Sequence, residues 1–136
     1  MEILASSARG IDDFLAYLGA SLALLAVFVA IYVQITPYRE LSLIRQGNPA
    51  AAASLSGTVI GFSIPLAQSV AQSVNLAEMA MWGAVALVVQ ILVFFVATRL
   101  VPDIGRHIPD GKIAAGIFLG AISLATGLLN AACMTY

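Results

Sequence analysis

The chain has 136 residues, of which 61% are hydrophobic and only 10% are charged, and its mean hydropathy is +0.99. Soluble domains have about 25% charged residues, so this composition disfavours a soluble enzyme and a disordered regulator. Six Lys and Arg against seven Asp and Glu give a net charge of −1, which offers no basic surface to a nucleic acid. The composition predicts an integral membrane protein in contact with the lipid bilayer.

Four stretches of the chain contain no Asp, Glu, Lys or Arg, and each is long enough for the about 20 helical residues that cross a bilayer. They are Phe14–Tyr38, Gln46–Ala77, Met79–Thr98 and Ile113–Tyr136. Inside lipid the backbone must satisfy its own hydrogen bonds, and these runs exceed the length of a barrel strand. We therefore predict an all-α polytopic fold, with four transmembrane helices in a single membrane domain, residues 1–136.

The cations predict how the chain is oriented. Five lie in the loops after the first and third spans, and one lies at the N-terminus: Arg39, Arg45, Arg99, Arg106 and Lys112, against Arg9. Because cytoplasmic loops are enriched in Lys and Arg, we expect both termini to be external. Aromatic residues near the span ends then predict interfacial belts, with Tyr17 and Trp82 outside and Tyr32 and Tyr38 inside.

The first basic loop leaves two interpretations open. Arg39–Gly47 places Leu41, Leu43 and Ile44 among charges, which is typical of a short helix on the membrane surface and equally compatible with an ordinary loop. Asn48 and Pro49 predict the start of the next helix, because Asn is a good N-cap and Pro is favoured at the first helical position.

The chain shows signs of an internal repeat. Gly19-Ala20 recurs as Gly83-Ala84 after 64 residues, and Gly57 recurs as Gly120 after 63. Each half is an apolar helix, a basic loop and a helix rich in small residues. We predict two tandem two-helix repeats, over about residues 12–75 and 76–136, related by a pseudo-twofold axis along the membrane normal.

Small residues line one face of the second span and one face of the fourth. At 100° per residue the glycines of each span fall in a narrow stripe: Gly57 and Gly61, and Gly116, Gly120 and Gly127. Such stripes let helix backbones approach closely. The close packing would occur between these two helices or across an oligomer. We expect a homo-oligomer, most simply a dimer, through Gly57 and Gly61 or through Gly116 and Gly120.

Polar residues on the same faces define a candidate lane for a solute. They are Ser54, Pro65, Gln68, Gln72 and Asn130, joined by Gln90 from the middle of the third span. Amides cost free energy in hydrocarbon unless they are paired, and Pro65 frees a carbonyl near Gly61. The alternative is that the amides simply bond one another between helices.

No catalytic grouping occurs. The single histidine, His107, lies in a basic loop, the single cysteine, Cys133, excludes an intrachain disulfide, and the four spans lack carboxylates. The missing carboxylates weaken a proton relay of the Asp or Glu type. We expect no enzyme activity, no cofactor and no metal site.

Several motifs resemble those of the YjfL-like bacterial inner-membrane proteins, a family named for domain of unknown function 350. The similar pieces are Ile35-Thr36-Pro37, the ASLSG run that ends at Gly57, Ile64-Pro65-Leu66 and Asn130-Ala131-Ala132-Cys133-Met134-Thr135. The resemblance covers nearly the whole chain. It implies a bacterial cytoplasmic membrane and four spans made of two repeated hairpins, and it implies no particular activity.

Two functions remain as hypotheses. The first is an oligomeric pore or carrier for a small ion or polar solute. The second is a non-conducting membrane scaffold that docks a cytoplasmic membrane-stress partner through the basic loops, Arg39–Gly47 and Arg99–Lys112.

Overall fold

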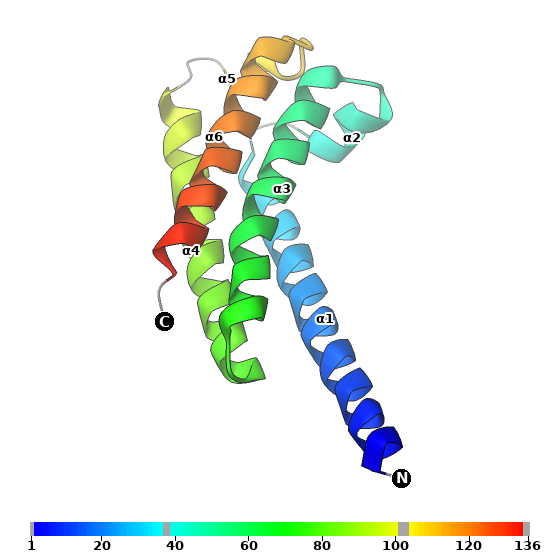
Figure 1. Ribbon diagram of the computed structural model, residues 1–136. Coiled ribbons are helices and arrows are strands. Elements are labelled where there is room, and N and C mark those ends of the chain that lie inside the picture. The colour runs from blue at the N-terminus through cyan, green and yellow to red at the C-terminus, as the bar shows by residue number, and fades with distance from the viewer. Residues whose placement is uncertain (1, 37–38, 101–103, 135–136) are drawn as a thin grey trace.

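The computed structural model describes residues 2–36, 39–100 and 104–134, and this part of the chain is helical without strands. Four long helices form a bundle, with two short helices at one end of it (Figure 1). In chain order the helices are α1 (Glu2–Ile35), α2 (Glu40–Arg45), α3 (Pro49–Gln72), α4 (Leu76–Leu100), α5 (Ile104–His107) and α6 (Ile113–Cys133). The long helices α1, α3, α4 and α6 are apolar enough to cross a membrane, which confirms the predicted fold class.

The local signals for the start of α3 act as predicted. Pro49 is its first residue, and the Asn48 side chain accepts a hydrogen bond from the Ala51 N–H at 3.0 Å. The Asn48 amide nitrogen also donates to the carbonyls of Ile108 and Pro109, at 2.8 and 3.1 Å. One side chain therefore caps α3 and fastens it to the segment that leads into α6.

Helix α1 begins earlier than predicted. The predicted span starts at Phe14, whereas the helix starts at Glu2 and runs for 34 residues. At 1.5 Å per residue it is about 51 Å long, and a hydrocarbon core is about 30 Å thick. The charged residues Arg9, Asp12 and Asp13 are helical and exposed, on the part of α1 that projects beyond the bundle (Figure 1).

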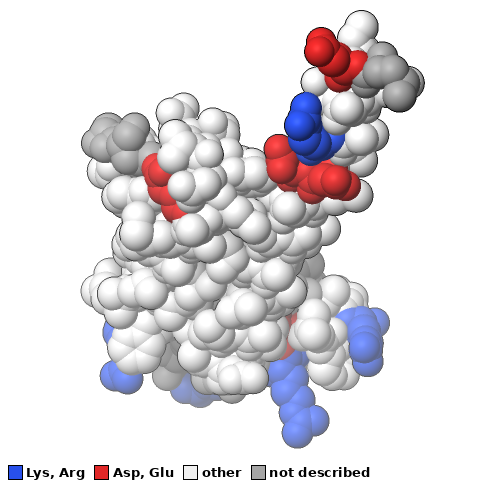
Figure 2. Space-filling view, turned by 90° about the horizontal axis from the view of Figure 1, so that it is seen from below, with Lys and Arg blue, Asp and Glu red and all other residues white. Residues whose placement is uncertain are grey.

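Charge is separated along the bundle. Figure 2 looks from the end where α1 begins, with acidic side chains near the viewer and most cations at the far end. The start of α1 and the turn from α3 to α4 lie on the near side, toward which α6 runs, and α2 and α5 lie on the far side (Figure 1). This separation is the basis of the orientation argument, and the placement of the termini in a cell stays a prediction.

The first basic loop contains the short helix α2, because Glu40–Arg45 is helical, and its place on the membrane surface stays a prediction. Its residues Leu43 and Ile44 pack against a buried cluster near the basic end of the bundle. Glu40 lies three and four positions before them, so all three share one face of the helix. That face turns the carboxylate inward, and the Glu40 side chain is only 1% exposed.

The centre of the molecule is the seam between α3 and α6. A Cβ atom on Gly57 would lie 2.6 Å from the Gly120 carbonyl oxygen, and one on Gly120 would lie 2.7 Å from the Ala53 oxygen. Gly116 faces the backbone of Ala50 in the same way, and Gly127 faces that of Gly61. The two backbones are in direct contact, an approach that only glycine permits.

The glycine stripes therefore pack against each other within one chain. A homo-oligomer formed through these stripes would first have to separate α3 from α6. The expected homo-oligomer stays a prediction, and its interface needs another face of the bundle.

Helix α1 does not follow the pseudo-twofold arrangement expected for two repeats. A twofold axis through the seam would exchange α1 with α4 and α3 with α6. The packing of α4 on α3 would then be matched by packing of α1 on α6. Instead α1 packs on α3 and α4, and among the described residues it makes no comparable contact with α6. The tandem repeat stays a prediction from the sequence.

Tyr32 corrects the prediction of an inner aromatic belt at that position. Its side chain is 0% exposed, and its ring lies 4.6 Å from that of Phe94, between centroids. The burial follows from the short helix α2 and from α3, which cover this part of α1. Tyr38, also assigned to that belt, lies outside the described residues, as do Pro37 and Thr135 of the family motifs.

Candidate functional site

Polar side chains gather inside the bundle rather than on its surface. In the described ranges the buried polar or charged residues are Thr36, Glu40, Ser54, Thr58, Ser69, Gln90 and Ser123. Five of these, together with Tyr32, follow one another through the bundle, and we call this set the polar chain. Its members are Tyr32, Glu40, Ser54, Thr58, Gln90 and Ser123.

The polar chain begins at the basic end of the bundle, where three oxygen atoms meet. The Tyr32 hydroxyl donates to Glu40 Oε1 at 3.0 Å and lies 2.9 Å from Ser54 Oγ. A phenol has a single proton to donate. While Tyr32 gives it to the carboxylate, the Ser54 hydroxyl is the donor toward Tyr32. Residues from α2 and α3 thus meet at the Tyr32 hydroxyl of α1.

The polar chain continues across the seam toward α4. The Thr58 hydroxyl donates to the Ser54 carbonyl at 2.7 Å and lies 3.2 Å from Ser123 Oγ. From α4, Gln90 Nε2 donates to the Ser123 carbonyl at 2.7 Å. Gln90 Oε1 is buried without a hydrogen-bond partner among the described residues. Buried acceptors left in this state are costly, and such groups mark functional positions inside membranes.

The geometry argues against a continuous proton wire. Between Ser54 and Thr58 the link runs through the Ser54 backbone carbonyl. A carbonyl oxygen has no proton to pass on, so the hydroxyls do not form an unbroken relay. The polar chain is a series of hard oxygen and amide groups without an aqueous opening, since each member is at most 2% exposed.

The structure places the predicted lane residues in different surroundings. Ser54 and Gln90 belong to the polar chain, and Pro65 is buried inside α3. Asn130 donates to the Ala86 carbonyl at 3.3 Å, nearer the opposite end of the bundle. Gln68 is half-buried and Gln72 is exposed at the end of α3. The structure does not bring the six residues together in one lane.

Pro65 acts on the seam rather than on a separate site. It removes the N–H that would bond the Gly61 carbonyl four residues earlier, yet α3 stays helical through it. A Cβ atom on Gly127 would lie 2.6 Å from the Gly61 carbonyl carbon. The carbonyl group that Pro65 frees is therefore covered by the α6 backbone.

Four members of the polar chain were not singled out as lane residues from the sequence. Thr58 lies one helical turn after Ser54 on the same face, and Ser123 lies on the glycine stripe of α6, so both carried a signal. Glu40 shares a helix face with Leu43 and Ile44, a pattern visible only once Glu40–Arg45 is taken as helical. Tyr32 had no such signal, because its position near a span end is typical of interfacial tyrosines.

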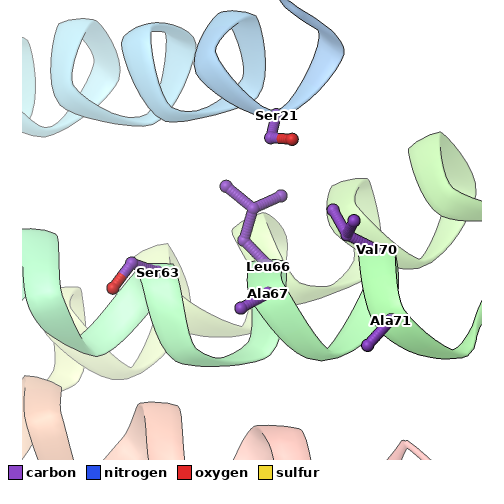
Figure 3. Close-up of a pocket in the computed structure, with 6 residues that line it drawn as sticks. All are labelled: Ser21, Ser63, Leu66, Ala67, Val70 and Ala71. Carbon is purple, nitrogen blue, oxygen red and sulfur yellow. The ribbon is translucent and has the colours of Figure 1, made fainter. Parts of the chain in front are cut away.

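One surface hollow is a separate feature. A groove of about 340 Å³ lies between α1 and α3 (Figure 3), and its walls are Ser21, Ser63, Leu66, Ala67, Val70 and Ala71. The Ser63 hydroxyl donates to the Ile60 carbonyl at 2.7 Å, and the Ser21 hydroxyl donates to the Tyr17 carbonyl. Both hydroxyls are used within their own helices, so the groove offers lipid an apolar surface.

A second groove, between α4 and α6, mirrors the first. Ser63, Leu66, Ala67 and Val70 of the first groove correspond, 63 residues later, to Thr126, Leu129, Asn130 and Cys133 of the second. The correspondence is limited to α3 and α6, because Ser21 on α1 has no counterpart at this spacing among the walls of the second groove, and the repeat stays a prediction. In the part of the chain that the structure describes, no group of three or more His, Cys, Asp or Glu side chains lies close enough to hold a metal ion.

Comparison with known proteins places these features in a family. Residues 5–134 match the family described as Domain of Unknown Function (DUF350). The chain is 40% identical to the UPF0719 inner membrane protein YjfL of Escherichia coli K12 over 123 residues, covering 90% of this chain and 93% of that protein. It is 25% identical to the UPF0719 transmembrane protein YshE of Bacillus subtilis over 122 residues, covering 88% and 91%. No solved structure matches the chain.

Proposed function

Since the chain belongs to the DUF350 family and is a multi-pass protein of the bacterial inner membrane, we propose that it carries a small ion or polar solute across that membrane through the polar chain. The observation that supports this function is Gln90 of the polar chain, which lies in the middle of α4, is only 1% exposed and has its Oε1 without a hydrogen-bond partner among the described residues. Polar groups buried at membrane depth are expensive and mark pathways for ions or substrates.

A carrier fits this packing better than an open pore through one chain. The seam between α3 and α6 has backbone against backbone, which leaves no water-filled passage beside the polar chain. Substrate would therefore enter only when helices move apart. In our proposal the moving element is α1, which has two buried residues, Phe28 and Tyr32. A pore between copies of the chain is the alternative arrangement within the same function.

The proposal includes an orientation, with α2 and α5 in the cytoplasm. It rests on the five cations at that end against Arg9 at the other and on the preference of cytoplasmic loops for Lys and Arg. A reporter enzyme that folds only in the cytoplasm, fused to the C-terminus, should be inactive. An active fusion would reverse the orientation.

Flux into liposomes tests the function. Purified protein in vesicles should transport at least one species from a panel of monovalent ions and small neutral solutes. The variant Gln90→Leu should abolish that flux, because it removes the amide that links α4 to the Ser123 carbonyl. It replaces a buried amide by an apolar side chain of similar size, so the fold should persist.

The matched control is Gln72→Leu, which changes the same residue type at an exposed position on α3 and should leave flux intact. Asn130→Leu tests whether the opposite end of the bundle takes part, and we expect a partial loss. If wild-type vesicles show no flux across the panel, or if Gln90→Leu transports as well as the wild type, the transport function is wrong.

One observation favours the scaffold as a second candidate. The side chains of Arg39, Arg45, Arg99, Arg106 and Lys112 are all exposed, and they lie in or beside the segments at one end of the bundle, where they give that end a basic character. Such a surface suits an acidic cytoplasmic protein partner. Under this function the vesicles show no flux, and replacing Arg45 and Lys112 with Glu should release a partner that co-purifies with the wild type.

A further inference from the structure

We propose that α1 pairs with α1 of a second copy of the chain, parallel and in register, through a row of apolar side chains. This row, which we call the α1 stripe, consists of Leu4, Ala8, Ile11, Leu15, Leu18 and Leu22. The interface goes beyond the transport function and does not depend on it. In the carrier proposed above, the paired α1 helices would stay fixed while the two bundles move.

The α1 stripe has the spacing of a coiled-coil seam. Its members follow one another at alternating intervals of four and three residues. This average of about 3.5 residues keeps a row of side chains facing a partner helix around which α1 supercoils. A helix face that meets only lipid can show the same spacing, so the part of α1 outside the bilayer is decisive.

The outer segment of α1, residues 2–13, extends past the hydrocarbon. The helix is about 51 Å long against a hydrocarbon core of about 30 Å, and the charge-free span begins only after Asp13. Every residue from Glu2 to Ala16 is exposed, and Leu4 and Ile11 are 71% and 59% exposed. Apolar side chains are unfavourable in water, so these two require a covering surface.

Charge in the outer segment lies on the side of α1 opposite the α1 stripe. At 100° per residue, Glu2, Arg9 and Asp13 lie about 160–180° around the helix from Ile11. Leu4 and Ala8 lie within about 60° of Ile11 by the same period. The outer segment is therefore amphipathic, and its apolar side is free of charge.

The outer segment is helical without support from its own bundle. Ser6, Ser7 and Gly10 are weak helix formers, and a short helix in water is marginal unless it packs on something. Helix α1 nevertheless runs on as one continuous helix to Glu2 and does not bend toward the membrane surface (Figure 1). A second helix alongside it would supply the missing contacts.

A second copy of the chain fits this surface by symmetry and charge. All copies insert in one direction, so a twofold axis along the membrane normal relates them and sets identical residues at equal depth. The leucines of the α1 stripe then meet their own counterparts. In a parallel pair Asp12 lies beside Ser7 of the second copy rather than beside another carboxylate, so no like charges oppose the pairing.

Helix α1 uses a different side for its own bundle. Its buried residues are Phe28 and Tyr32, and the α1 stripe lies about 80–160° around the helix from Phe28. Leu18 and Leu22 accordingly remain 43% and 56% exposed. Gly19 lies beside the stripe rather than in it, so an alanine there should not disturb the pair.

Disulfide cross-linking in membranes tests the pairing. Cys133 is first replaced by Ser, so that an introduced cysteine is the sole one in the chain. Ala8→Cys places a thiol on the α1 stripe, where equivalent positions of two copies come close enough for a disulfide, and mild oxidation should give a covalent dimer. Ser6→Cys is the matched control, because it is also exposed in the outer segment but lies away from the stripe, and it should cross-link several-fold less.

The mass of the purified full-length protein in mild detergent gives a second measurement. The wild type should be a dimer, and Ile11→Lys should raise its dissociation constant at least about tenfold, because the interface would bury an unpaired charge. Ile11 is exposed in the single chain, so the helical fold of the variant should persist. Asp13→Lys makes the same residue on the charged side of the outer segment and should leave the dimer intact.

Each outcome decides something. A wild type that is monomeric or larger than a dimer, equal cross-linking at the two positions, or a dimer that resists Ile11→Lys would overturn the interface. A monomer in which Ala8→Cys is shielded from a water-soluble thiol reagent, and Ser6→Cys is not, would place the α1 stripe on the membrane surface instead. A dimer without flux in vesicles would overturn transport and leave the interface standing, and flux from a monomer would do the reverse.

Discussion

The seam between α3 and α6 and the long helix α1 are both apolar helical structure, yet they are held in opposite ways. In the most apolar 18-residue stretch of α3, 44% of the stretch is buried inside the protein. In that of α1 only 6% is buried, although α1 is the more hydrophobic helix. In water the more hydrophobic helix would be the core helix. In lipid the hydrophobic effect does not separate helix from solvent, so close contact of small residues and buried hydrogen bonds select the core.

The difference also concerns movement. The seam joins two backbones through glycines, so neither helix can shift without breaking contact along several turns. Helix α1 is held near one end, where Phe28 stacks on Phe62 at 4.5 Å between ring centroids and Tyr32 joins the polar chain. Its outer half is largely exposed on the described surface. A rigid pair and a lightly held helix are the two parts that a carrier mechanism needs.

The largest effect should follow from adding one methyl group to the seam. Gly127→Ala would place its Cβ atom 2.6 Å from the Gly61 carbonyl carbon, and a backbone cannot move aside as a side chain can. Overpacking of a tight interior costs about 1–3 kcal/mol, and we expect the upper part of that range. Unfolding in mild detergent, followed by circular dichroism, measures the loss.

The same change in α1 is the control. Gly19→Ala meets nothing within 4 Å, so it should be neutral or stabilise the helix by up to about 1 kcal/mol through higher helix propensity. Equal destabilisation by the two alanines would mean that the outer half of α1 is packed against a further surface, such as a second copy of the chain.

A smaller loss should follow from Tyr32→Phe. The change removes the hydroxyl that lies between Glu40 and Ser54, and buried groups that lose a partner cost about 1–3 kcal/mol. Tyr17→Phe on the same helix, at a half-buried position outside the polar chain, should change stability by less than about 0.5 kcal/mol. Chemical denaturation of both variants in matched detergent checks the pair, and equal losses would argue against the buried position of Tyr32.

A loss of about 1–2 kcal/mol is expected from Asn48→Ala, which removes an N-cap and two bonds to the segment before α6. Asn75→Ala removes a single bond, which the Glu78 N–H at the start of α4 donates to Asn75 Oδ1, and should cost less. The ratio of the two losses, from thermal unfolding, reports how far Asn48 stabilises the seam rather than one helix end. A larger loss for Asn75→Ala would contradict this role.

The smallest effect should come from Ser63→Ala in the groove between α1 and α3. Its hydroxyl bonds the Ile60 carbonyl of its own helix, so the expected change is below about 0.5 kcal/mol. Flux in vesicles should also be unchanged. Loss of flux in Ser63→Ala would place the substrate path in this groove rather than in the polar chain.

The helices could be predicted from the sequence because lipid allows few alternatives. A charge-free run of about 20 residues or more is helical, and Asn48 with Pro49 marks where α3 starts. The glycine stripes also indicated close packing. The surfaces that these stripes pack against did not follow from the pattern. A stripe shows which face of a helix packs closely, and it does not identify the partner helix.

Glu40 shows why the site was harder to predict than the fold. Its carboxylate comes from a six-residue helix between two spans, so a search of the spans for buried charge passes over it. The inward direction of this side chain depends on how α2 folds against α3, which is a tertiary property. Gln90 was identified because an amide in the middle of an apolar span is unusual, whichever direction its side chain faces.

The seam has a consequence for the way the protein is made. Its two helices are separated in the sequence by the long helix α4, and α6 leaves the ribosome after both α3 and α4. Until α6 has inserted, the glycines of α3 and the polar residues Ser54 and Thr58 face lipid or the insertion machinery, with part of their final contacts missing. The early hairpin of α1 and α3 is therefore a substrate for membrane quality control, and a chain truncated before Ile113 should be degraded rather than accumulate.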